Sequence, residues 1–202
     1  MKIGALLALG FGDAGSGIIA ANIARGGDID PMVAGEKVQG IFGFCDIHHF
    51  AEANEVLDVD IMMFVNQISE VVHSAVNKYG GSPNKNIGEA FVCVWKFKPE
   101  DIKRKKGQPV LWKKSKTKHI VADLALFSYL KVIAKINKLD TLVNYSHHEA
   151  LTNIVPGFKV RMGFGLHVGW AIEGAIGSGF KIDASYLSPN MNLAARLEAA
   201  SR

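Results

Sequence analysis

The stretch VQGIFGFCDIHHF, residues 38–50, decides the fold of this chain. Its first ten residues form an almost continuous apolar run that ends with one carboxylate, which is the pattern of a buried strand. Cys45, Asp46, His48 and His49 then place four potential metal ligands within five positions. The stretch can therefore hold a zinc site, a catalytic carboxylate, or a strand end without chemistry.

The residue pattern does not favour zinc. A structural zinc site needs four nitrogen or sulfur ligands, usually as two separated pairs. Here the ligands form one cluster, and successive strand residues point to opposite faces. The other histidine pair, His147-His148, lies in a polar stretch without a cysteine.

The composition describes a soluble globular domain, because 49% of the 202 residues are hydrophobic and 21% are charged. The net charge of +4 is unevenly spread, since residues 96–118 hold ten Lys/Arg and two acids. We interpret this basic segment as a solvated loop and expect neither nucleic acid nor direct membrane contact. Cys45 and Cys93 lie in apolar runs, which favours buried free thiols.

Residues 1–35 contain GFGDAG at positions 10–15, a match to the dinucleotide-binding G-x-G-x-x-G motif. In that alternative, Asp28 or Asp30 would bind the ribose. The turn-rich stretch DIDPMVAGEKV follows, where a Rossmann unit would need another strand. We therefore interpret residues 1–35 as a helical lead-in and linker, with an apolar run too short to span a membrane.

The pattern after residue 50 predicts an α+β fold. Apolar residues at steps of three and four predict a helix over 58–79, ended by Gly80-Gly81. The other expected elements are a hairpin around Gly88-Glu89, a helix over 119–139, a strand over 159–168, a short strand among turns in 174–190, and a helix from 191 onward. The order strand, helix, hairpin, helix, strand suits a ferredoxin-like core.

In such a core the first strand pairs with the hairpin, so Asp46 and Glu89 can be neighbours. Two carboxylates at one sheet edge can hold two Mg²⁺ ions, since hard cations prefer oxygen ligands. The alternative is a strand-end acid facing water and an ordinary turn acid.

Four stretches in register carry a resemblance to a known family: FCDIHHF, KYGGSPNKNIGEAF, GFGLHVGWAIEGAIGS and DASYLSPNMNLAARLE. Together they resemble the class III nucleotidyl cyclase catalytic domain over residues 36–202. The resemblance implies a ferredoxin-like βαββαβ core with its C-terminal part cut off, and a basic insertion at 97–118. Residues 1–35 resemble the segment that precedes this domain in some protist cyclases.

The resemblance also implies roles for individual residues. Asp46, the Ile47 carbonyl and Glu89 would bind two Mg²⁺ or Mn²⁺ ions, with Glu89 standing where the family usually has aspartate. Lys85 and Ser185 would contact the purine, and Phe50 and Gly88 would contact the substrate. Asn192 and Arg196 would orient the ribose and stabilise charge on the α-phosphate, while His167 would be structural.

These roles imply an adenylate cyclase that converts ATP to cyclic AMP and pyrophosphate. Lys85 would donate to adenine N1, whereas guanine presents an N–H donor there. In the family the active site forms between two catalytic domains, so a homodimer or heterodimer is expected. We expect a cytoplasmic domain, whose parent protein can be membrane-bound or ciliary.

Several departures from the family pattern, among them Glu89 in place of aspartate, keep an alternative open. His49 and Ala51 replace the usual residues around the metal-site phenylalanine, and Ser188-Pro189 replaces the usual turn before Asn192. The family's triphosphate-binding lysine lies downstream of this segment, so in this chain it is either cut off or missing. The alternative is a catalytically weak cyclase-like domain that acts as a dimerisation or regulatory module. A guanylate cyclase is disfavoured by Lys85.

Overall fold

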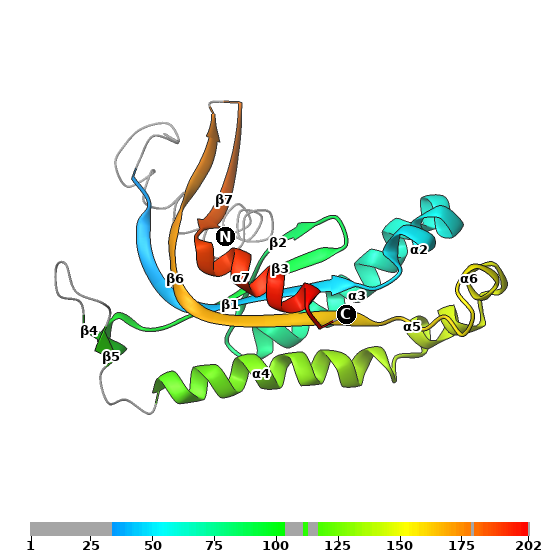
Figure 1. Ribbon diagram of the computed structural model, residues 1–202, viewed down its shortest axis with the longest axis horizontal. Coiled ribbons are helices and arrows are strands. Elements are labelled where there is room, and N and C mark those ends of the chain that lie inside the picture. The colour runs from blue at the N-terminus through cyan, green and yellow to red at the C-terminus, as the bar shows by residue number, and fades with distance from the viewer. Residues whose placement is uncertain (1–33, 104–110, 113–116, 179, 202) are drawn as a thin grey trace, which may run out of the picture.

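The computed structural model describes residues 34–103, 111–112, 117–178 and 180–201. The expectations for residues 1–33, the helical lead-in and the GFGDAG alternative, lie outside the described residues. One antiparallel sheet with the strand order β2-β3-β1-β6-β7 forms the centre of the molecule (Figure 1). Its strands are β1 (Glu36–Ile47), β2 (Ser82–Ile87), β3 (Ala90–Lys96), β6 (Met162–Ser178) and β7 (Lys181–Leu187).

The sheet confirms the predicted ferredoxin-like core. β1 lies between β3 and β6 and pairs antiparallel with both, and β2 pairs with β3 at one edge. The order β2-β3-β1-β6 is that of the βαββαβ unit, with β7 added at the far edge. The hairpin expected around Gly88-Glu89 joins β2 to β3.

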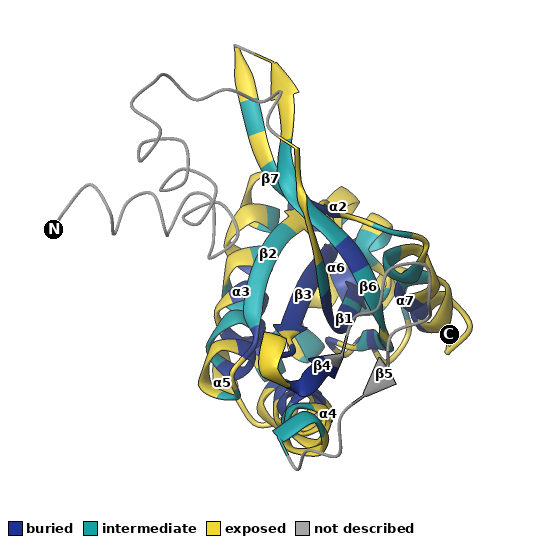
Figure 2. Ribbon diagram, turned by 90° about the vertical axis from the view of Figure 1, so that its left-hand side faces the viewer, coloured by how far each residue is buried: buried dark blue, intermediate teal, exposed yellow. Residues whose placement is uncertain are grey.

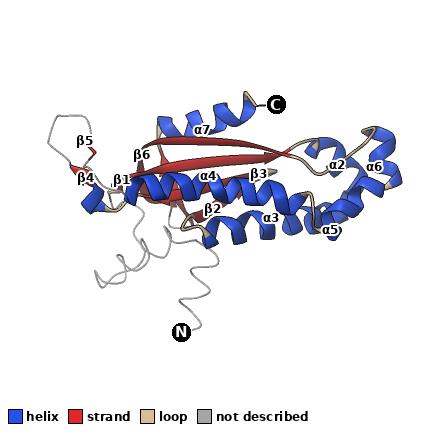
Figure 3. Ribbon diagram, turned by 90° about the horizontal axis from the view of Figure 1, so that it is seen from below, coloured by secondary structure: helices blue, strands red, loops and turns tan. Residues whose placement is uncertain are grey.

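Helices cover both faces of the sheet (Figure 3). The longest two, α3 (Ile61–Lys78) and α4 (Thr117–Ile136), lie on one face, and α7 (Pro189–Ala199) lies on the other. The shorter helices are α2 (Phe50–Leu57), α5 (Asp140–Val143), α6 (Glu149–Ile154), and the 3-10 turns η1 (Asp58–Asp60), η2 (Pro99–Asp101) and η3 (Asn144–His147).

Burial follows the alternation of the central strand. Ile41 and Cys45 of β1 belong to the large core under α3 and α4, whereas Phe42 belongs to a smaller core under α7. Most of β1 and β3 is buried, as the dark strands at the centre of Figure 2 show. The apolar run in residues 38–47 is therefore long because β1 is covered on both faces.

The helix expected over residues 58–79 begins with a 3-10 turn and continues as α3. It ends where the chain turns at Gly80, whose φ of 72° is in the left-handed region that glycine adopts without strain. Gly81 then packs against Trp95, because a Cβ there would stand 2.5 Å from the indole ring. The structure therefore explains why glycine occupies both positions: Gly80 for its backbone angle and Gly81 for its contact with Trp95.

The hairpin β6–β7 corrects the sequence-based expectation for residues 159–190. The expected strand ended at Val168 and was followed by a short strand among turns, whereas β6 continues to Ser178 and pairs with all of β7. Gly174 and Gly177 suggested turns, yet they pair with Ser185 and Ile182 of β7, and β6 continues through them. The hairpin projects from the body as an arm (Figure 1).

The described part of the basic segment is more ordered than a solvated loop. After η2, the strands β4 (Ile102–Lys103) and β5 (Leu111–Trp112) form a small antiparallel pair. Asp101 and Ile102 are buried at its base. Its Lys/Arg-rich centre, residues 104–110, lies outside the described residues.

Both thiols are free and buried, as expected. Cys45 Sγ donates to the carbonyl of Phe91 at 3.8 Å, and burial raises the pKa of the Cys45 thiol well above its ordinary value. No helix within the described ranges is long and apolar enough to cross a bilayer.

Candidate active site

The segments that carry two acids, Asp46 and Glu89, meet at the end of the central strand. Asp46 is 6% exposed and pairs with Ala90 of β3 on one side and Gly163 of β6 on the other. The next residue, Ile47, donates its backbone N–H to the carbonyl of Glu89 at 3.3 Å. Glu89 is half-buried in the turn between β2 and β3. The fold therefore places Asp46 and Glu89 on touching segments, as the predicted topology requires.

A pocket of about 460 Å³ opens beside the acid pair. Its walls are the β1–α2 turn and the hairpin tip, namely Ile47, His48, His49, Phe50, Ala51, Glu52 and Glu89. Two left-handed residues shape it: His49 (φ 57°) turns the chain into α2, and Gly88 (φ 60°) turns β2 into β3. Phe50 is the first residue of α2, so both predicted substrate contacts lie at this pocket or next to it.

The charge of the pocket suits a cation. The pKa of the Glu52 carboxyl is lowered, first by a hydrogen bond from the backbone N–H of Glu52 and then by one from the His49 ring. The pocket wall formed by Glu52 therefore stays anionic. With Asp46, Glu89 and the Ile47 carbonyl, the donors are hard oxygen atoms. Mg²⁺ and Mn²⁺ prefer such donors and keep further positions for water and phosphate. The residues present therefore fit a divalent ion.

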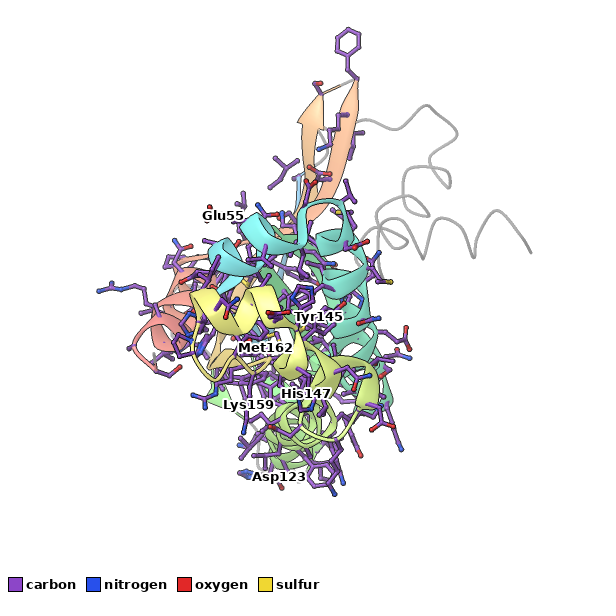
Figure 4. The ribbon with its side chains drawn as sticks, turned by 90° about the vertical axis from the view of Figure 1, so that its right-hand side faces the viewer. Glu55, Asp123, Tyr145, His147, Lys159 and Met162 are labelled. Carbon is purple, nitrogen blue, oxygen red and sulfur yellow. The ribbon has the colours of Figure 1, made fainter. Side chains whose placement is uncertain are left out.

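The four potential zinc ligands of the opening stretch do not form one cluster in the described part of the chain. Cys45 faces the large core, whereas Asp46 follows it on the opposite face. His49 is exposed and lies 3.4 Å from Glu52. His148, of the second histidine pair, caps α6 by accepting from the Leu151 N–H, and its neighbour His147 is labelled in Figure 4. Among the described residues, no three His, Cys, Asp or Glu side chains gather around one point.

The two predicted purine contacts are joined by a hydrogen bond. Lys85 Nζ on β2 donates to Ser185 Oγ on β7 at 2.8 Å, although the residues are 100 positions apart. Next to them, Asn84 Nδ2 donates to the carbonyl of Ala184 at 3.4 Å. β2 and β7 are the two edges of the sheet. The sheet must therefore curl until its two edges meet, and the two predicted purine contacts lie at this meeting point.

The predicted catalytic pair lies on one helix. Asn192 and Arg196 are both exposed on α7, one turn apart. The helix begins at Ser188, whose Oγ accepts from the Asn190 N–H at 2.9 Å, and Pro189 occupies the first helical position. Serine at the cap and proline at N1 are favoured choices. Ser188-Pro189, a departure from the family pattern, is therefore a sound helix start.

A track of glycines brings α7 against β6. A Cβ on Gly163, Gly165 or Gly169 would enter the Glu198 carboxylate, the Ala194 carbonyl or the Asn190 side chain respectively. These glycines share one face of β6 because they are separated by even numbers of residues. The alternating glycines of GFGLHVG thus let a helix lie close to a strand, which the sequence analysis did not recognise.

Asn190 fixes the start of α7 to β6. Its Nδ2 donates to the Trp170 carbonyl at 2.9 Å, and its Oδ1 lies 3.1 Å from His167 Nε2. Because Nδ2 is the donor to Trp170, Oδ1 is left as an acceptor, so His167 Nε2 carries a proton. Ser188 Oγ also donates to the Trp170 carbonyl. His167 therefore has a structural contact, and Asn190 is a residue that sequence analysis missed.

The structure therefore gathers the predicted residues into three groups. These are the acid pair with its turn and pocket, the Lys85–Ser185 pair, and the exposed Asn192 and Arg196 on α7.

Comparison with known proteins identifies the family of this domain. The family model described as the adenylate and guanylate cyclase catalytic domain matches residues 36–202. A model of the RasGEFs all helical domain matches residues 1–24, outside the described part. An adenylate cyclase from Anabaena cylindrica is 22% identical over 160 residues, which are 79% of this chain and 26% of that protein. The chain thus spans about a quarter of that relative.

Solved structures show the same fold. A bacterial light-regulated adenylyl cyclase is 29% identical with a TM-score of 0.62, over 91% of this chain and 45% of that chain. The adenylyl cyclase CyaB from P. aeruginosa is 18% identical with a TM-score of 0.57, over 83% and 74%. The guanylate cyclase domain of RhGC from Catenaria anguillulae, in complex with GTP, is 19% identical with a TM-score of 0.56, over 81% and 74%. The chain belongs to the adenylate and guanylate cyclase catalytic domain family.

Proposed function

We propose that this chain is an adenylate cyclase domain that converts ATP to cyclic AMP and pyrophosphate. The observation that carries the proposal is the 2.8 Å hydrogen bond from Lys85 Nζ to Ser185 Oγ. It joins two side chains that come from opposite edges of the sheet. Both side chains can form hydrogen bonds with the polar atoms of a purine base.

The choice of ATP rests on hydrogen-bond direction. An ammonium group only donates, and adenine N1 accepts, whereas guanine carries a proton at N1. Ser185 is 4% exposed and holds Lys85 in place, while its hydroxyl can donate or accept. The adenylate cyclase names of the light-regulated and Anabaena relatives support the same choice.

In the proposed reaction the ribose 3′-hydroxyl attacks the α-phosphorus, and pyrophosphate leaves. Asp46, Glu89 and the Ile47 carbonyl would hold two divalent ions. Ions bound there would lower the pKa of the hydroxyl and neutralise charge on the phosphate oxygens. Arg196 offers a planar, permanently charged fork to the α-phosphate in the transition state, and Asn192 orients the ribose.

The site is proposed to be shared between two chains. Asp46 and Glu89 of one chain would bind the metal ions of a site. The residues that contact the purine, the ribose and the α-phosphate in that site would come from the partner chain. The exposure of Asn192 and Arg196 supports this proposal, since both side chains are available to a substrate held by another chain. Because this chain carries both sets of residues, a homodimer would contain two sites. A heterodimer with another cyclase domain is the alternative.

A second candidate function is a weakly active or inactive cyclase-like domain that serves as a dimerisation or regulatory module. The observation that favours it is the pocket wall, where Glu89 has a longer arm than aspartate and Glu52 adds negative charge near the expected phosphates. A guanylate cyclase is the third candidate and is disfavoured by Lys85.

Turnover of ATP and GTP with Mn²⁺, by this chain and by one extended past Arg202, separates the three candidates. We expect cyclic AMP from ATP, and an Asp46→Ala variant at least about 100-fold slower, because a metal ligand contributes several kcal/mol in the transition state. Asp140→Ala, an exposed acid at the start of α5, is the control and should keep its activity.

Lys85→Glu tests the base preference, since a carboxylate would accept from guanine N1–H. We expect the ratio of kcat/KM for ATP over GTP to fall at least about tenfold. Full activity of Asp46→Ala would contradict the metal assignment. Absence of turnover with either nucleotide, in a chain that still dimerises, would support the regulatory module.

A further inference from the structure

The central strand β1 is paired on one side only at its start. It pairs with β6 from Glu36 onward, whereas its pairing with β3 begins at Gly40. β3 ends at Lys96, and the chain then leaves the sheet, with the Phe97 N–H donating to the Gln39 carbonyl at 3.0 Å. Among the described strands, none continues along this edge of β1 in place of β3. The sheet therefore has a gap beside the start of its central strand.

A pocket of about 590 Å³ lies at this gap, and we call it the β1 pocket. Its walls come from the start of β1, the segment that follows β3, and β6, and Val38, Phe97 and Ile102 form their apolar part. The candidate metal site lies at the other end of the strand, which starts at the left of Figure 1 and ends beside α2. Asp46 is seven residues beyond Gln39, up to about 23 Å away at 3.3 Å per residue. The β1 pocket is therefore separate from the pocket beside the acid pair.

The side chain of Gln39 lines the β1 pocket and has an unused hydrogen-bond donor. Gln39 is 4% exposed, and in the described part of the chain its Nε2 has no acceptor. A buried amide donor without an acceptor costs free energy, which an incoming acceptor would recover. The terminal torsion of a glutamine side chain is soft, so the N–H can turn toward a ligand in the pocket. The β1 pocket thus offers a specific donor to a ligand oxygen.

The charged walls of the β1 pocket are held in place by contacts within the chain. Three lysines and two glutamates line the pocket. Glu173 accepts hydrogen bonds from Lys96 Nζ and from the Tyr186 hydroxyl, both at 3.0 Å, so its charge is already matched. The ammonium of Lys37 lies 4.1 Å from the centre of the Trp170 ring. Walls that are ordered before a ligand arrives lower the entropy cost of binding.

The third lysine, Lys98, supplies a charge that favours a negative ligand. Its ion pair with Glu100 is 3.7 Å long and exposed on both sides, so it contributes little. Glu36, the second glutamate of the walls, is exposed, and water screens its charge. Lys98 also belongs to the basic segment 96–118, whose ten Lys/Arg and two acids attract anions to this end of the molecule.

We propose that the β1 pocket binds a small organic anion with an apolar body, such as an aromatic carboxylate. The apolar body packs against Val38, Phe97 and Ile102, while the carboxylate accepts from Gln39 Nε2 and pairs with the Lys98 ammonium. The proposal does not depend on cyclase activity, because none of these residues belongs to the candidate active site.

An NMR titration of the full chain with three probes of equal shape tests the ligand class. The probes are 3-phenylpropionate, 3-phenylpropionamide and 3-phenylpropylammonium, and the signals observed are those of the probe and of the Gln39 side-chain N–H. We expect the anion to bind with saturation and to shift the Gln39 signal, the neutral amide to bind at least about tenfold more weakly, and the cation not to bind. Equal affinity for the three probes, or no saturable binding of the anion, would overturn the proposal.

Two pairs of variants locate the bound probe. Gln39→Leu keeps the size of the side chain and removes the donor, so the affinity for 3-phenylpropionate should fall at least about tenfold. The urea midpoint of this variant should not fall, because leucine leaves no unpartnered amide. Gln67→Leu on α3 is the matched control and should keep the affinity of wild type.

Lys98→Glu should weaken binding of the anion by a similar factor, and Lys138→Glu is its control, since Lys138 is an exposed lysine just after α4. Unchanged affinity in either Gln39→Leu or Lys98→Glu would place the probe elsewhere and overturn the site.

Discussion

Gly165 is a residue at which β6 and α7 approach closely. A Cβ at this position would enter the backbone carbonyl of Ala194 and crowd the backbone N–H of Glu198. Both obstacles are backbone atoms of α7, so no side-chain rotation can make room. The need for glycine here comes from packing and not from an unusual backbone angle.

We predict that Gly165→Ala lowers the free energy of unfolding by about 1–3 kcal/mol, the usual cost of overpacking. Urea unfolding measures the change. Gly157→Asn is the control, since Gly157 has a φ of 72°, which asparagine tolerates, and open space around its Cα. Wild-type stability of the alanine variant would show that α7 can move away from β6 at no cost.

His73 is a residue whose environment gives the fold a pH dependence. It lies on α3, with its Nε2 3.2 Å from the Oδ1 of Asn86 on β2, and its ring meets Phe91 edge-on. Burial is the largest influence and lowers the pKa of His73 below its ordinary value of 6.5, while Asn86 and the charge of Glu70 act weakly in the opposite direction. The unfolded chain therefore binds this proton more tightly than the folded one.

We predict that His73 contributes a loss of stability as the pH falls below 6.5, with the full stability present above it. Urea midpoints measured on both sides of this pH should fall less for His73→Phe than for wild type, because phenylalanine keeps the aromatic contact and cannot titrate. An equal fall in both proteins would contradict a lowered pKa.

At the level of elements, α7 is positioned by its first turn. Asn190 links this turn to His167 and to the Trp170 carbonyl of β6, and Ser188 caps it. Asn192 and Arg196 follow within the next two turns of the same helix. The direction in which they project is therefore set by Asn190, which is not among the predicted substrate contacts.

We predict that Asn190→Ala lowers kcat about tenfold or more and leaves the KM for ATP nearly unchanged. The reason is that a small shift of α7 misplaces groups that act in the transition state, whereas Lys85 and Ser185 lie on other elements. Asn190→Asp should recover part of kcat, since it can still accept from His167 but cannot donate to Trp170. A variant that is less stable but keeps its kcat would reduce Asn190 to a purely structural role.

Elements with a regular pattern could be predicted from the sequence, and those shaped by their neighbours could not. β1, α3 and the β2–β3 hairpin follow from an apolar run, steps of three and four, and Gly88. The length of the β6–β7 hairpin was underestimated because its glycines have low strand propensity. Pairing with the neighbouring strand determines the conformation there. Likewise, the apolar residues of α4 predict a helix but not which side the core covers.

At the level of the whole molecule, the curl of the sheet builds the candidate site. Lys85 and Ser185 meet only because β2 and β7, the two sheet edges, come together. Sequence motifs named both residues, but their contact depends on the accumulated twist of five strands. The acid pair was predictable from topology, because its two segments pair directly in a ferredoxin-like core.

The division of the site between two chains gives a prediction for mixtures of variants. Asp46→Ala damages the metal half of the site, and Arg196→Ala damages the phosphate half. Each variant alone should be inactive, because both sites of its homodimer lack one half. In a mixed dimer, one site combines Asp46 of one chain with Arg196 of the other and is intact, while the second site lacks both.

Equal amounts of the two variants should therefore regain about a quarter of wild-type activity, since random pairing makes half of the dimers mixed and half of their sites intact. Co-expression with two different affinity tags, followed by sequential purification, isolates the mixed dimer, which should reach about half of wild-type activity per dimer. An inactive mixed dimer would mean that each nucleotide is bound and converted by a single chain.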